Sequence, residues 1–294
     1  PERRVLLPAR RAALGAASGT PRELGIVLPS VLNMFEQPDP HAAVCSQATI
    51  GSSVAVLESR GRWTLAETMD RYRGWLRARD LRSVAPGSGA GYPATERSLE
   101  VLNLIGHVYR DPDVTSGAPL TAAPMLSRLE LLEESEDWVR VRLPDGRDGW
   151  MHPGDVRLDP DSPDRPPEPL EPGAVAATAL RFLGLPYLWG GTTAYGLDCS
   201  GLVQLAYRAH GYLLPRDADQ QFADPHLAEA PGDALQPGDL VFFGPDEGGI
   251  THVGLATSPR EFVSATTYRS PMVRIDSLDD PYWVGLYRGA RRLG

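Results

Sequence analysis

The chain has 294 residues and a formal net charge of −9, and all 29 of its basic residues are arginine. An acidic chain without a basic cluster is a poor partner for nucleic acid or for an anionic membrane surface. No run of residues approaches the roughly 18 apolar residues of a membrane-spanning helix. Two cysteines, Cys45 and Cys199, do not make a disulfide framework. Because the sequence begins at Pro1, it is uninformative about a targeting segment. The length favours two or three small domains.

An internal repeat occupies the first half of the chain. Segment 54–63 aligns with 129–138, and 72–82 aligns with 147–157 at the same offset. In each copy two tryptophans are separated by the same interval and the second follows a glycine: Trp63 and Trp75, then Trp138 and Trp150. Repetition of one pattern at a fixed offset predicts two copies of one small fold.

Both copies have the pattern of short strands. Residues 139–143, "VRVRL", alternate apolar and polar side chains, and "PDG" at 144–146 predicts a turn into the next strand. Several short strands within about 80 residues predict a small β-barrel. The Gly-Trp pair after a hairpin turn resembles the bacterial SH3-like domains, over residues 30–84 and 95–158. We expect the four tryptophans in the barrel cores, with ligand contact as the alternative.

Two segments divide the chain into domains. Residues 85–93, "APGSGAGYP", predict a linker, because no strand precedes their glycines as a phosphate loop would need. Residues 159–173 are rich in proline and acidic side chains and predict a second linker. We expect four parts: an SH3-like domain with an N-terminal arm over 1–85, a second SH3-like domain over 86–160, a proline-rich linker over 161–173 and a third domain over 174–294.

The third domain places a cysteine at the start of a helix. Apolar spacing predicts one helix over 174–183 and a second from Cys199 to near Gly211. The helix dipole and the free backbone N–H groups at an N-terminus favour a thiolate, so we expect a lowered pKa for Cys199. The same N–H groups can stabilise an oxyanion. This placement predicts a nucleophile.

A cysteine nucleophile also requires a base. Of the six histidines, His252 opens the second of two predicted strands, 238–244 and 251–257, from which it can reach a helix packed on the sheet. The alternative is a histidine that serves only the strand edge. No cluster of histidine, cysteine and acidic residues has metal-ligand spacing, so we expect no metal and no other cofactor.

Five sequence blocks of the third domain together form a recognisable set of motifs. In chain order they are "GLPYLWGG", "GLDCSGLVQ", "YLLPRDADQQ", "LQPGDLVFF" and "THVGL". They resemble the NlpC/p60 family of papain-like cell-wall cysteine peptidases, over about residues 172–294. The resemblance implies an α+β papain-like catalytic domain after the two SH3-like β-barrels. It also implies the following roles: Cys199 as nucleophile, His252 as base, Tyr187 at the oxyanion site, and Asp198, Ser200 and Trp189 as substrate-binding residues.

The chain departs from the family pattern at the third catalytic residue. The family commonly has a histidine on the strand after the base, and counting along this sequence from His252 by the family's spacing places Ser264 there. A serine oxygen can accept a hydrogen bond from Nδ1–H of His252 and orient the ring, but it adds no charge. Ala218 is a smaller departure, because relatives often have a hydroxyl there.

The resemblance implies an endopeptidase that cleaves the γ-D-glutamyl–diamino acid bond of peptidoglycan stem peptides. Two SH3-like domains before the catalytic domain resemble murein-peptide recycling enzymes, in which the first barrel closes one end of the cleft and requires a free N-terminal L-Ala. We assign Tyr72 to that wall, with a tyrosine of the barrel surface as the alternative. The alternatives are a wall-peptide binding protein with a weakened site and an acyltransferase or amidase. Recycling favours the cytoplasm over the cell envelope or secretion. The diamino acid and the oligomeric state stay open.

Overall fold

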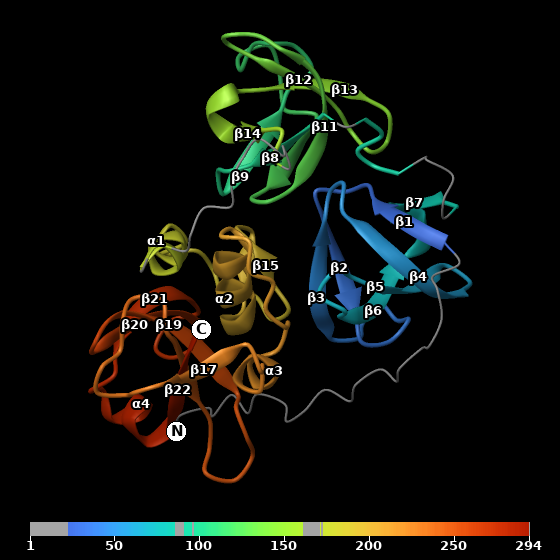
Figure 1. The fold of residues 1–294 in the computed structure, drawn as a ribbon. Coiled ribbons are helices and arrows are strands. Elements are labelled where there is room, and N and C mark those ends of the chain that lie inside the picture. Colours follow the sequence, from blue (N-terminus) through green and yellow to red (C-terminus); the bar gives the residue numbers. More distant parts are fainter. Residues whose placement is uncertain (1–22, 86–90, 96, 161–170, 172, 294) are drawn as a thin grey trace. The chain divides into compact units, whose positions relative to one another are not determined.

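The computed structural model describes residues 23–85, 91–95, 97–160, 171 and 173–293 (Figure 1). They form two compact units. Residues 23–160 group with 189–195, which we call the repeat unit, and residues 171–188 group with 196–293, which we call the C-terminal unit. Most of the two predicted linkers, at 86–90 and 161–170, lies outside the described residues, as does the predicted N-terminal arm. Within the described ranges no helix is long and apolar enough to cross a membrane.

The repeat unit consists of short antiparallel strands and two turns of 3-10 helix. Its first half contains β1 (Glu23–Val27), β2 (Val31–Phe35), β3 (Val44–Thr49), β4 (Ser53–Arg60), β5 (Trp63–Glu67), β6 (Arg73–Arg77), η1 (Ala78–Asp80) and β7 (Leu81–Val84). Its second half contains β8 (Ser98–Val101), β9 (Ile105–Val108), β10 (Thr121–Pro124), β11 (Arg128–Glu134), β12 (Val139–Arg142), β13 (Asp148–Met151), η2 (Pro153–Asp155) and β14 (Val156–Leu158).

The strand order confirms the internal repeat. The first sheet has the order β3-β2-β6-β5-β4-β1-β7, and the second half repeats its last five members as β13-β12-β11-β8-β14, with β10 and β9 paired separately. The turns η1 and η2 begin at Ala78 and Pro153, which are separated by the same offset as the repeated sequence segments. The repeat is therefore a repeat of topology as well as of sequence.

The tryptophans of the two copies differ in burial. Trp63 and Trp75 are buried, as predicted. Trp138 and Trp150 are only partly buried, so the prediction of a core position is wrong for the second copy. The repeated sequence preserved the position of each tryptophan in its hairpin, but burial depends on which side chains pack above it.

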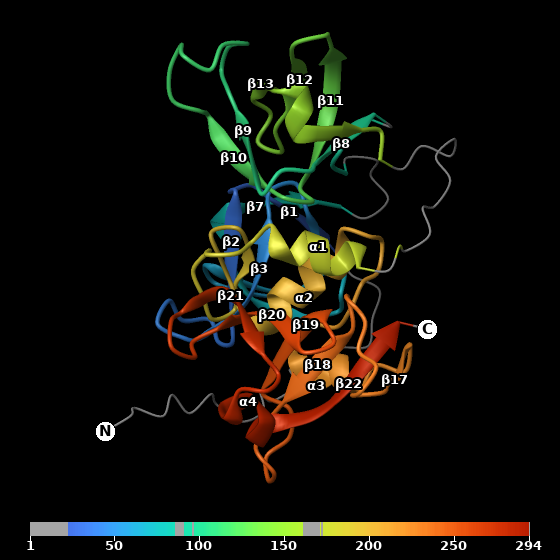
Figure 2. The same cartoon turned by 90° about the vertical axis from the view of Figure 1, so that its left-hand side faces the viewer.

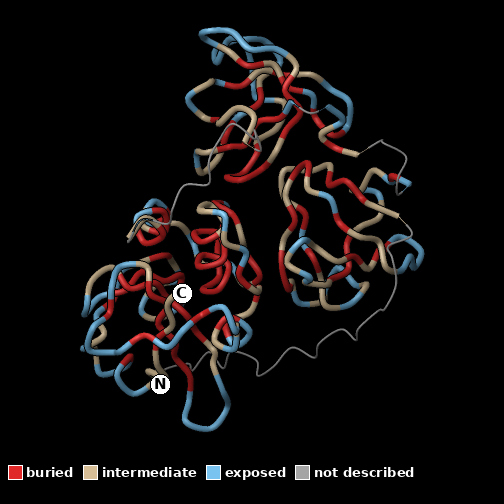
Figure 3. Tube along the Cα trace, in the orientation of Figure 1, coloured by how far each residue is buried: buried red, intermediate tan, exposed pale blue. Residues whose placement is uncertain are grey.

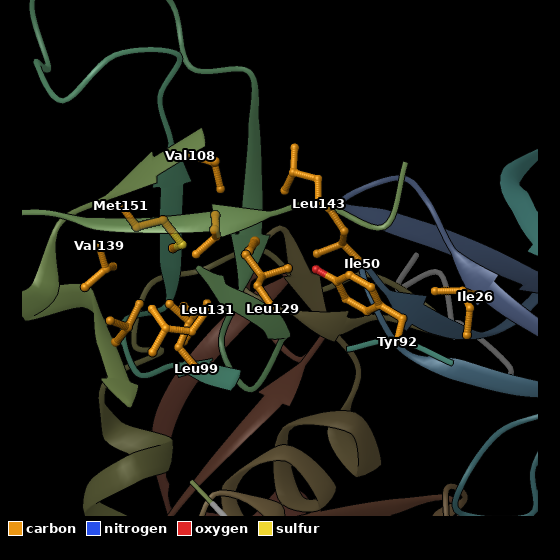
Figure 4. Packing of buried hydrophobic residues seen from close by; sticks show 14 of the residues in the cluster. Ile26, Ile50, Tyr92, Leu99, Val108, Leu129, Leu131, Val139, Leu143 and Met151 are labelled. Atoms are coloured by element: carbon orange, nitrogen blue, oxygen red, sulfur yellow. The ribbon is translucent and has the colours of Figure 1, made fainter. Parts of the chain in front are cut away.

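One hydrophobic cluster joins the two halves of the repeat unit. It includes Ile26 and Ile50 from the first half and Leu129 from the second, with Tyr92 between them (Figure 4). The hydroxyl of Tyr92 donates to the carbonyl oxygen of Arg142 at 2.5 Å. Tyr92, near the end of the predicted linker 85–93, is thus part of this core, because its aromatic side chain packs between the two halves.

The C-terminal unit combines four helices with a six-stranded antiparallel sheet (Figures 1 and 2). The helices are α1 (Ala174–Leu180), α2 (Cys199–Arg208), α3 (Ala218–Phe222) and α4 (Pro281–Leu286). The sheet order β17-β22-β18-β19-β20-β21 uses β17 (Leu227–Ala230), β18 (Leu240–Phe243), β19 (His252–Ser258), β20 (Glu261–Thr266), β21 (Met272–Ser277) and β22 (Tyr287–Leu293). Two short strands, β15 (Thr192–Thr193) and β16 (Gly196–Leu197), precede α2.

The first two helices pack on the middle of this sheet. Both α1 and α2 contact β19 and β20, and Figure 3 shows that these strands are buried along most of their length. The predicted helix starts at 174 and 199 and the two predicted strands before and at His252 are confirmed. The helix that begins at Cys199 ends at Arg208, earlier than predicted. This packing brings the N-terminus of α2 to the start of β19.

Candidate active site

The nucleophile candidate lies in the first turn of α2. Asp198 is the N-cap, and its Oδ1 accepts a hydrogen bond from the backbone N–H of Gly201 at 2.7 Å. An N-cap of this kind satisfies a backbone donor that the helix itself leaves unpaired. Cys199 follows at the first helical position and is 7% exposed. The sequence therefore fixes the cysteine at a helix start by a cap that precedes it directly.

A buried arginine holds that helix start in place. The Nη1 and Nη2 groups of Arg216 donate to the two carboxylate oxygens of Asp198 at 2.9 and 2.7 Å. Nη1 also donates to Oγ of Ser200 at 2.9 Å. The side chain of Arg216 is 0% exposed and that of Asp198 is 7% exposed. Both neighbours of Cys199 are thus bound to one guanidinium, and Arg216 was not among the predicted site residues.

The segment around Arg216 has further hydrogen bonds to α2. Gln204 Nε2 donates to the carbonyl oxygen of Leu214 at 2.9 Å. Gln221 Nε2 donates to the carbonyl oxygens of Ser200 and Pro215 at 3.2 and 2.9 Å. The block "YLLPRDADQQ" therefore supports the nucleophile helix. The side-chain oxygens of Asp198 and Ser200 already accept hydrogen bonds from Arg216. Direct contact of these two residues with substrate stays a prediction.

His252 begins β19 and contacts the predicted third residue. The register of β19 and β20, with Leu255 opposite Val263, brings Ser264 within hydrogen-bonding distance of the imidazole. The bond joins Oγ of Ser264 to Nε2 of His252 at 3.1 Å. We predicted Nδ1, and that atom was wrong. Ser264 therefore makes no hydrogen bond to the other ring nitrogen of His252, Nδ1.

Aromatic side chains surround the imidazole. The indole of Trp283 stacks on His252 with ring centroids 5.0 Å apart and an interplanar angle of 25°. The ring of Phe243, opposite His252 in the β18–β19 ladder, lies 5.8 Å away and is tilted by 46°. Trp283 was not predicted, because a contact between residues 252 and 283 leaves no periodic signal in a single sequence.

Burial decides the charge state of both candidates. It raises the pKa of Cys199 to about 12, and the carboxylate of Asp198 acts in the same direction against hydrogen bonds from the backbone of Val253 and Ser200. Burial lowers the pKa of His252 to about 4, with Asp198 acting in the opposite direction. The prediction of a lowered thiol pKa is therefore wrong, because the desolvation of a buried anion outweighs the helix terminus. Burial therefore favours the neutral form of both the Cys199 thiol and the His252 imidazole in the absence of substrate.

These pKa values predict that activity is lost in acid only at a pH well below 6.5, the pKa of an ordinary histidine side chain. The base must be neutral, and the pKa of His252 is lowered to about 4. We expect kcat/KM for a stem tripeptide to stay level from pH 7 to about pH 5 and to fall only as the pH approaches 4. The measurement is kcat/KM against pH.

Unfolding must be followed in parallel with this profile. The folded pKa of His252, about 4, lies below the value of 6.5 for a free side chain, so its stabilisation is present above pH 6.5 and is lost as the pH falls toward 4. The loss amounts to about 3 kcal/mol. An acid limb centred near pH 6.5, with the protein still folded, contradicts the neutral pair.

A second prediction concerns Ser264, whose side chain is fully buried. Replacement by alanine removes one neutral hydrogen bond to His252, worth about 0.5–1.5 kcal/mol. We expect Ser264→Ala to lower kcat by about 2- to 12-fold with little change in KM. Steady-state kinetics on a stem tripeptide measure this. Ser258, on β19 and remote from that hydrogen bond, gives the matched control Ser258→Ala; equal effects of the two changes would remove Ser264 from the site.

The other predicted residues fall in both units. The backbone of Tyr187 bridges to Leu197, next to the N-cap Asp198, and its N–H donates to the carbonyl oxygen of Pro271 at 3.0 Å. Its role at an oxyanion site stays a prediction. Trp189 lies in the 189–195 loop, which groups with the repeat unit, and Tyr72 packs against the core of that unit. The substrate roles of Trp189 and Tyr72 also stay predictions.

Metal binding is a separate question. Over the part of the chain that the structure describes, no group of three or more histidine, cysteine or acidic side chains is placed to hold a metal ion.

Comparisons with known proteins address the same residues. The profile of the NlpC/P60 family matches residues 184–292, and the bacterial SH3 domain profile matches residues 114–157. A gamma-D-glutamyl-L-lysine dipeptidyl-peptidase of Bacillus cereus is 28% identical over 84% of this chain and 74% of its own length. The crystal structure of an NlpC/P60 family protein from Bacillus cereus has a TM-score of 0.79 at 23% identity, over 92% of this chain and 99% of that one.

A shorter relative shows to which family the chain belongs. The probable endopeptidase NlpC of Escherichia coli is 40% identical over 113 residues, which are 37% of this chain and 70% of that protein. The matched family region contains Cys199, His252 and Ser264. With a capped cysteine at a helix start, a histidine at the facing strand and this identity, the chain belongs to the NlpC/P60 family.

Proposed function

We propose that this protein is a cysteine endopeptidase that hydrolyses the γ-D-glutamyl–diamino acid bond of peptidoglycan stem peptides. The observation that carries the proposal is the position of Cys199 at the capped N-terminus of α2, with the backbone of Val253, next to His252, hydrogen-bonded to it. The name of the Bacillus cereus relative, a gamma-D-glutamyl-L-lysine dipeptidyl-peptidase, supports the bond cleaved. Ser264 supports His252 as the base.

The neutral pair determines the order of proton transfer. His252 accepts the proton of the Cys199 thiol as sulfur attacks the γ-carbonyl carbon, so that no free thiolate is needed beforehand. The developing oxyanion lies at the helix N-terminus, where Tyr187 and backbone N–H groups stabilise it. The imidazolium then gives the proton to the leaving amine of the diamino acid. Water hydrolyses the thioester with His252 again as base, which restores the thiol.

The architecture belongs to the same proposal. In this proposal the domain bounds are 1–85 and 86–160 for two SH3-like β-barrels, 161–173 for a linker and 174–294 for a papain-like α+β domain, and the strand orders given above apply to the described residues within these bounds. Support comes from the order of five strands that the two halves share and from the packing of α2 on β19. The bacterial SH3 profile matches the second of these barrels.

The first barrel restricts the substrate to small peptides with a free N-terminal L-Ala. The 189–195 loop, which carries Trp189, is joined to this barrel by a hydrogen bond of 3.0 Å from the N–H of Thr192 to Oε1 of Gln47. Gly190 also lies against Val44, where an added Cβ would approach the backbone to 2.8 Å. These contacts support a barrel that borders a substrate loop, with Tyr72 and Trp189 as its contact residues.

The test compares three kinds of substrate. Release of the diamino acid is measured from L-Ala-γ-D-Glu-L-Lys and its diaminopimelate analogue, from the N-acetylated tripeptides, and from intact sacculi. We expect fast release from the free tripeptides and release at least about 100-fold slower from the acetylated ones, because acetylation removes the free amine that the proposed restriction requires. Equal rates for sacculi and tripeptide contradict the restriction, and tight binding without release supports the wall-peptide binding protein instead.

A further inference from the structure

The indole of Trp283 is held on several sides. Trp283 lies in α4, whose N-cap Asp280 accepts a hydrogen bond from the N–H of Tyr282. Its ring contacts those of Phe243, Phe262 and Tyr268 at centroid distances of 4.8, 5.2 and 5.5 Å. The side chain is 2% exposed. An indole packed in this way has one fixed orientation, so it can impose an orientation on a ring stacked against it.

His252 needs such a constraint more than a base with a charged partner does. Ser264 gives it one hydrogen bond, of 3.1 Å to Nε2, which fixes the position of one ring edge. A single bond at one edge leaves the imidazole free to rotate about the line through that bond. The stacked indole, at an interplanar angle of 25°, removes this rotation. Phe243 is tilted by 46° and supports the same ring less well.

We propose that Trp283 is a positioning residue of the peptidase reaction: its indole sets the plane of the His252 ring while Ser264 sets the ring edge. The inference rests on the proposed function, in which His252 moves the proton of Cys199. With both constraints, Nδ1, which is not bonded to Ser264, keeps a fixed direction for proton transfer. Loss of either constraint lowers the fraction of time that this direction is correct.

The principal variants are Trp283→Phe and Trp283→Met, with Phe242→Leu as the matched control. Phe242 is a fully buried aromatic residue of β18 that contacts Phe222 and pairs with Val253. We expect Trp283→Met to lower kcat by about 10- to 100-fold with KM changed by less than about 3-fold, since misplacement of a catalytic group costs up to about 100-fold. Trp283→Phe, which keeps a ring, retains kcat within about 3-fold. Thermal unfolding identifies the folded variants.

A double-mutant cycle tests the separate roles of Trp283 and Ser264 without the more disruptive Trp283→Met change. In the Ser264→Ala background the ring edge is free, and Trp283→Phe is expected to cost about 10-fold or more in kcat, against about 3-fold in the wild type. Equal costs in the two backgrounds contradict the proposal. So does a folded Trp283→Met protein whose kcat equals that of Phe242→Leu, or one in which only KM changes.

A spectroscopic measurement separates this inference from the proposed function. If the wild type releases no diamino acid from any stem peptide, the proposed function fails, and the role of Trp283 is then read from the imidazole signals of His252 in protein labelled with ¹⁵N-histidine. We expect one sharp set of signals in the wild type and in Phe242→Leu, and broadened signals in Trp283→Phe combined with Ser264→Ala. Sharp signals in that double variant overturn the inference.

Discussion

Cys199→Ala is expected to reduce stem-peptide hydrolysis by at least about 10⁴-fold, because the attacking sulfur is removed and only binding and oxyanion stabilisation remain. His252→Ala is expected to have an effect of similar size. The double variant should be no worse than either single one, since the two side chains act in one step. Release of the diamino acid, with enzyme in large excess to detect residual turnover, measures all three.

The second cysteine provides the control for this experiment. Cys45 is buried like Cys199, in the core of the repeat unit, where its Sγ–H donates to the carbonyl oxygen of Met34. Cys45→Ala removes the same atoms from an equally dry site, and we expect hydrolysis to change by less than about 2-fold. A Cys199→Ala protein with a tenth of wild-type activity would exclude Cys199 as the nucleophile.

Arg216→Met is expected to lower the free energy of unfolding by about 3–5 kcal/mol, because it leaves the carboxylate of Asp198 buried without its charged partner. The guanidinium makes two bonds to that carboxylate and one to Ser200, at 2.7–2.9 Å. Denaturant unfolding of the full chain, followed by a probe in the C-terminal unit, measures the change. Activity falls as well, since the start of α2 loses its anchor.

An exposed ion pair gives the comparison. Arg260 and Asp279 lie 2.5 Å apart, but their side chains are 75% and 59% exposed. We expect Arg260→Met to cost about 0–1 kcal/mol, as is usual for surface pairs. Combining Arg216→Met with Asp198→Asn, which removes the buried charge and keeps an N-cap, is expected to restore part of the stability. Equal costs at Arg216 and Arg260 would contradict a structural role for the buried pair.

Local pattern was enough to predict much of the fold. The constant offset between the repeated segments predicted a repeated topology, since both tryptophan hairpins obey the same turn and strand rules. The helix start at Cys199 followed from apolar spacing, and the structure adds Asp198 as its N-cap. Core positions for Trp138 and Trp150 were predicted incorrectly, and Tyr92 lies in a core although its segment was predicted to be a linker, because burial depends on residues from elsewhere in the chain.

The candidate site likewise contains residues that were predicted and residues that were missed. Cys199 and His252 were expected from their predicted elements and from the resemblance to the NlpC/p60 family, and the family's spacing pointed to Ser264, which lies 3.1 Å from His252. Arg216 and Trp283 were missed, since nothing local indicates that an arginine is 0% exposed or that a tryptophan stacks on a distant histidine. The sign of the thiol pKa shift was missed for the same reason: helix position is readable from sequence, but desolvation is not.

The protonated state of Cys199 has a consequence for redox chemistry. Peroxides and thiol-disulfide exchange consume thiolates, and susceptibility to sulfenic acid formation follows thiolate character and exposure. A side chain that is 7% exposed, with a pKa raised to about 12 by burial, has little of either. We therefore expect the resting protein to react slowly with peroxide and with disulfides, and in the proposed mechanism the sulfur becomes reactive when substrate is bound and His252 accepts the proton.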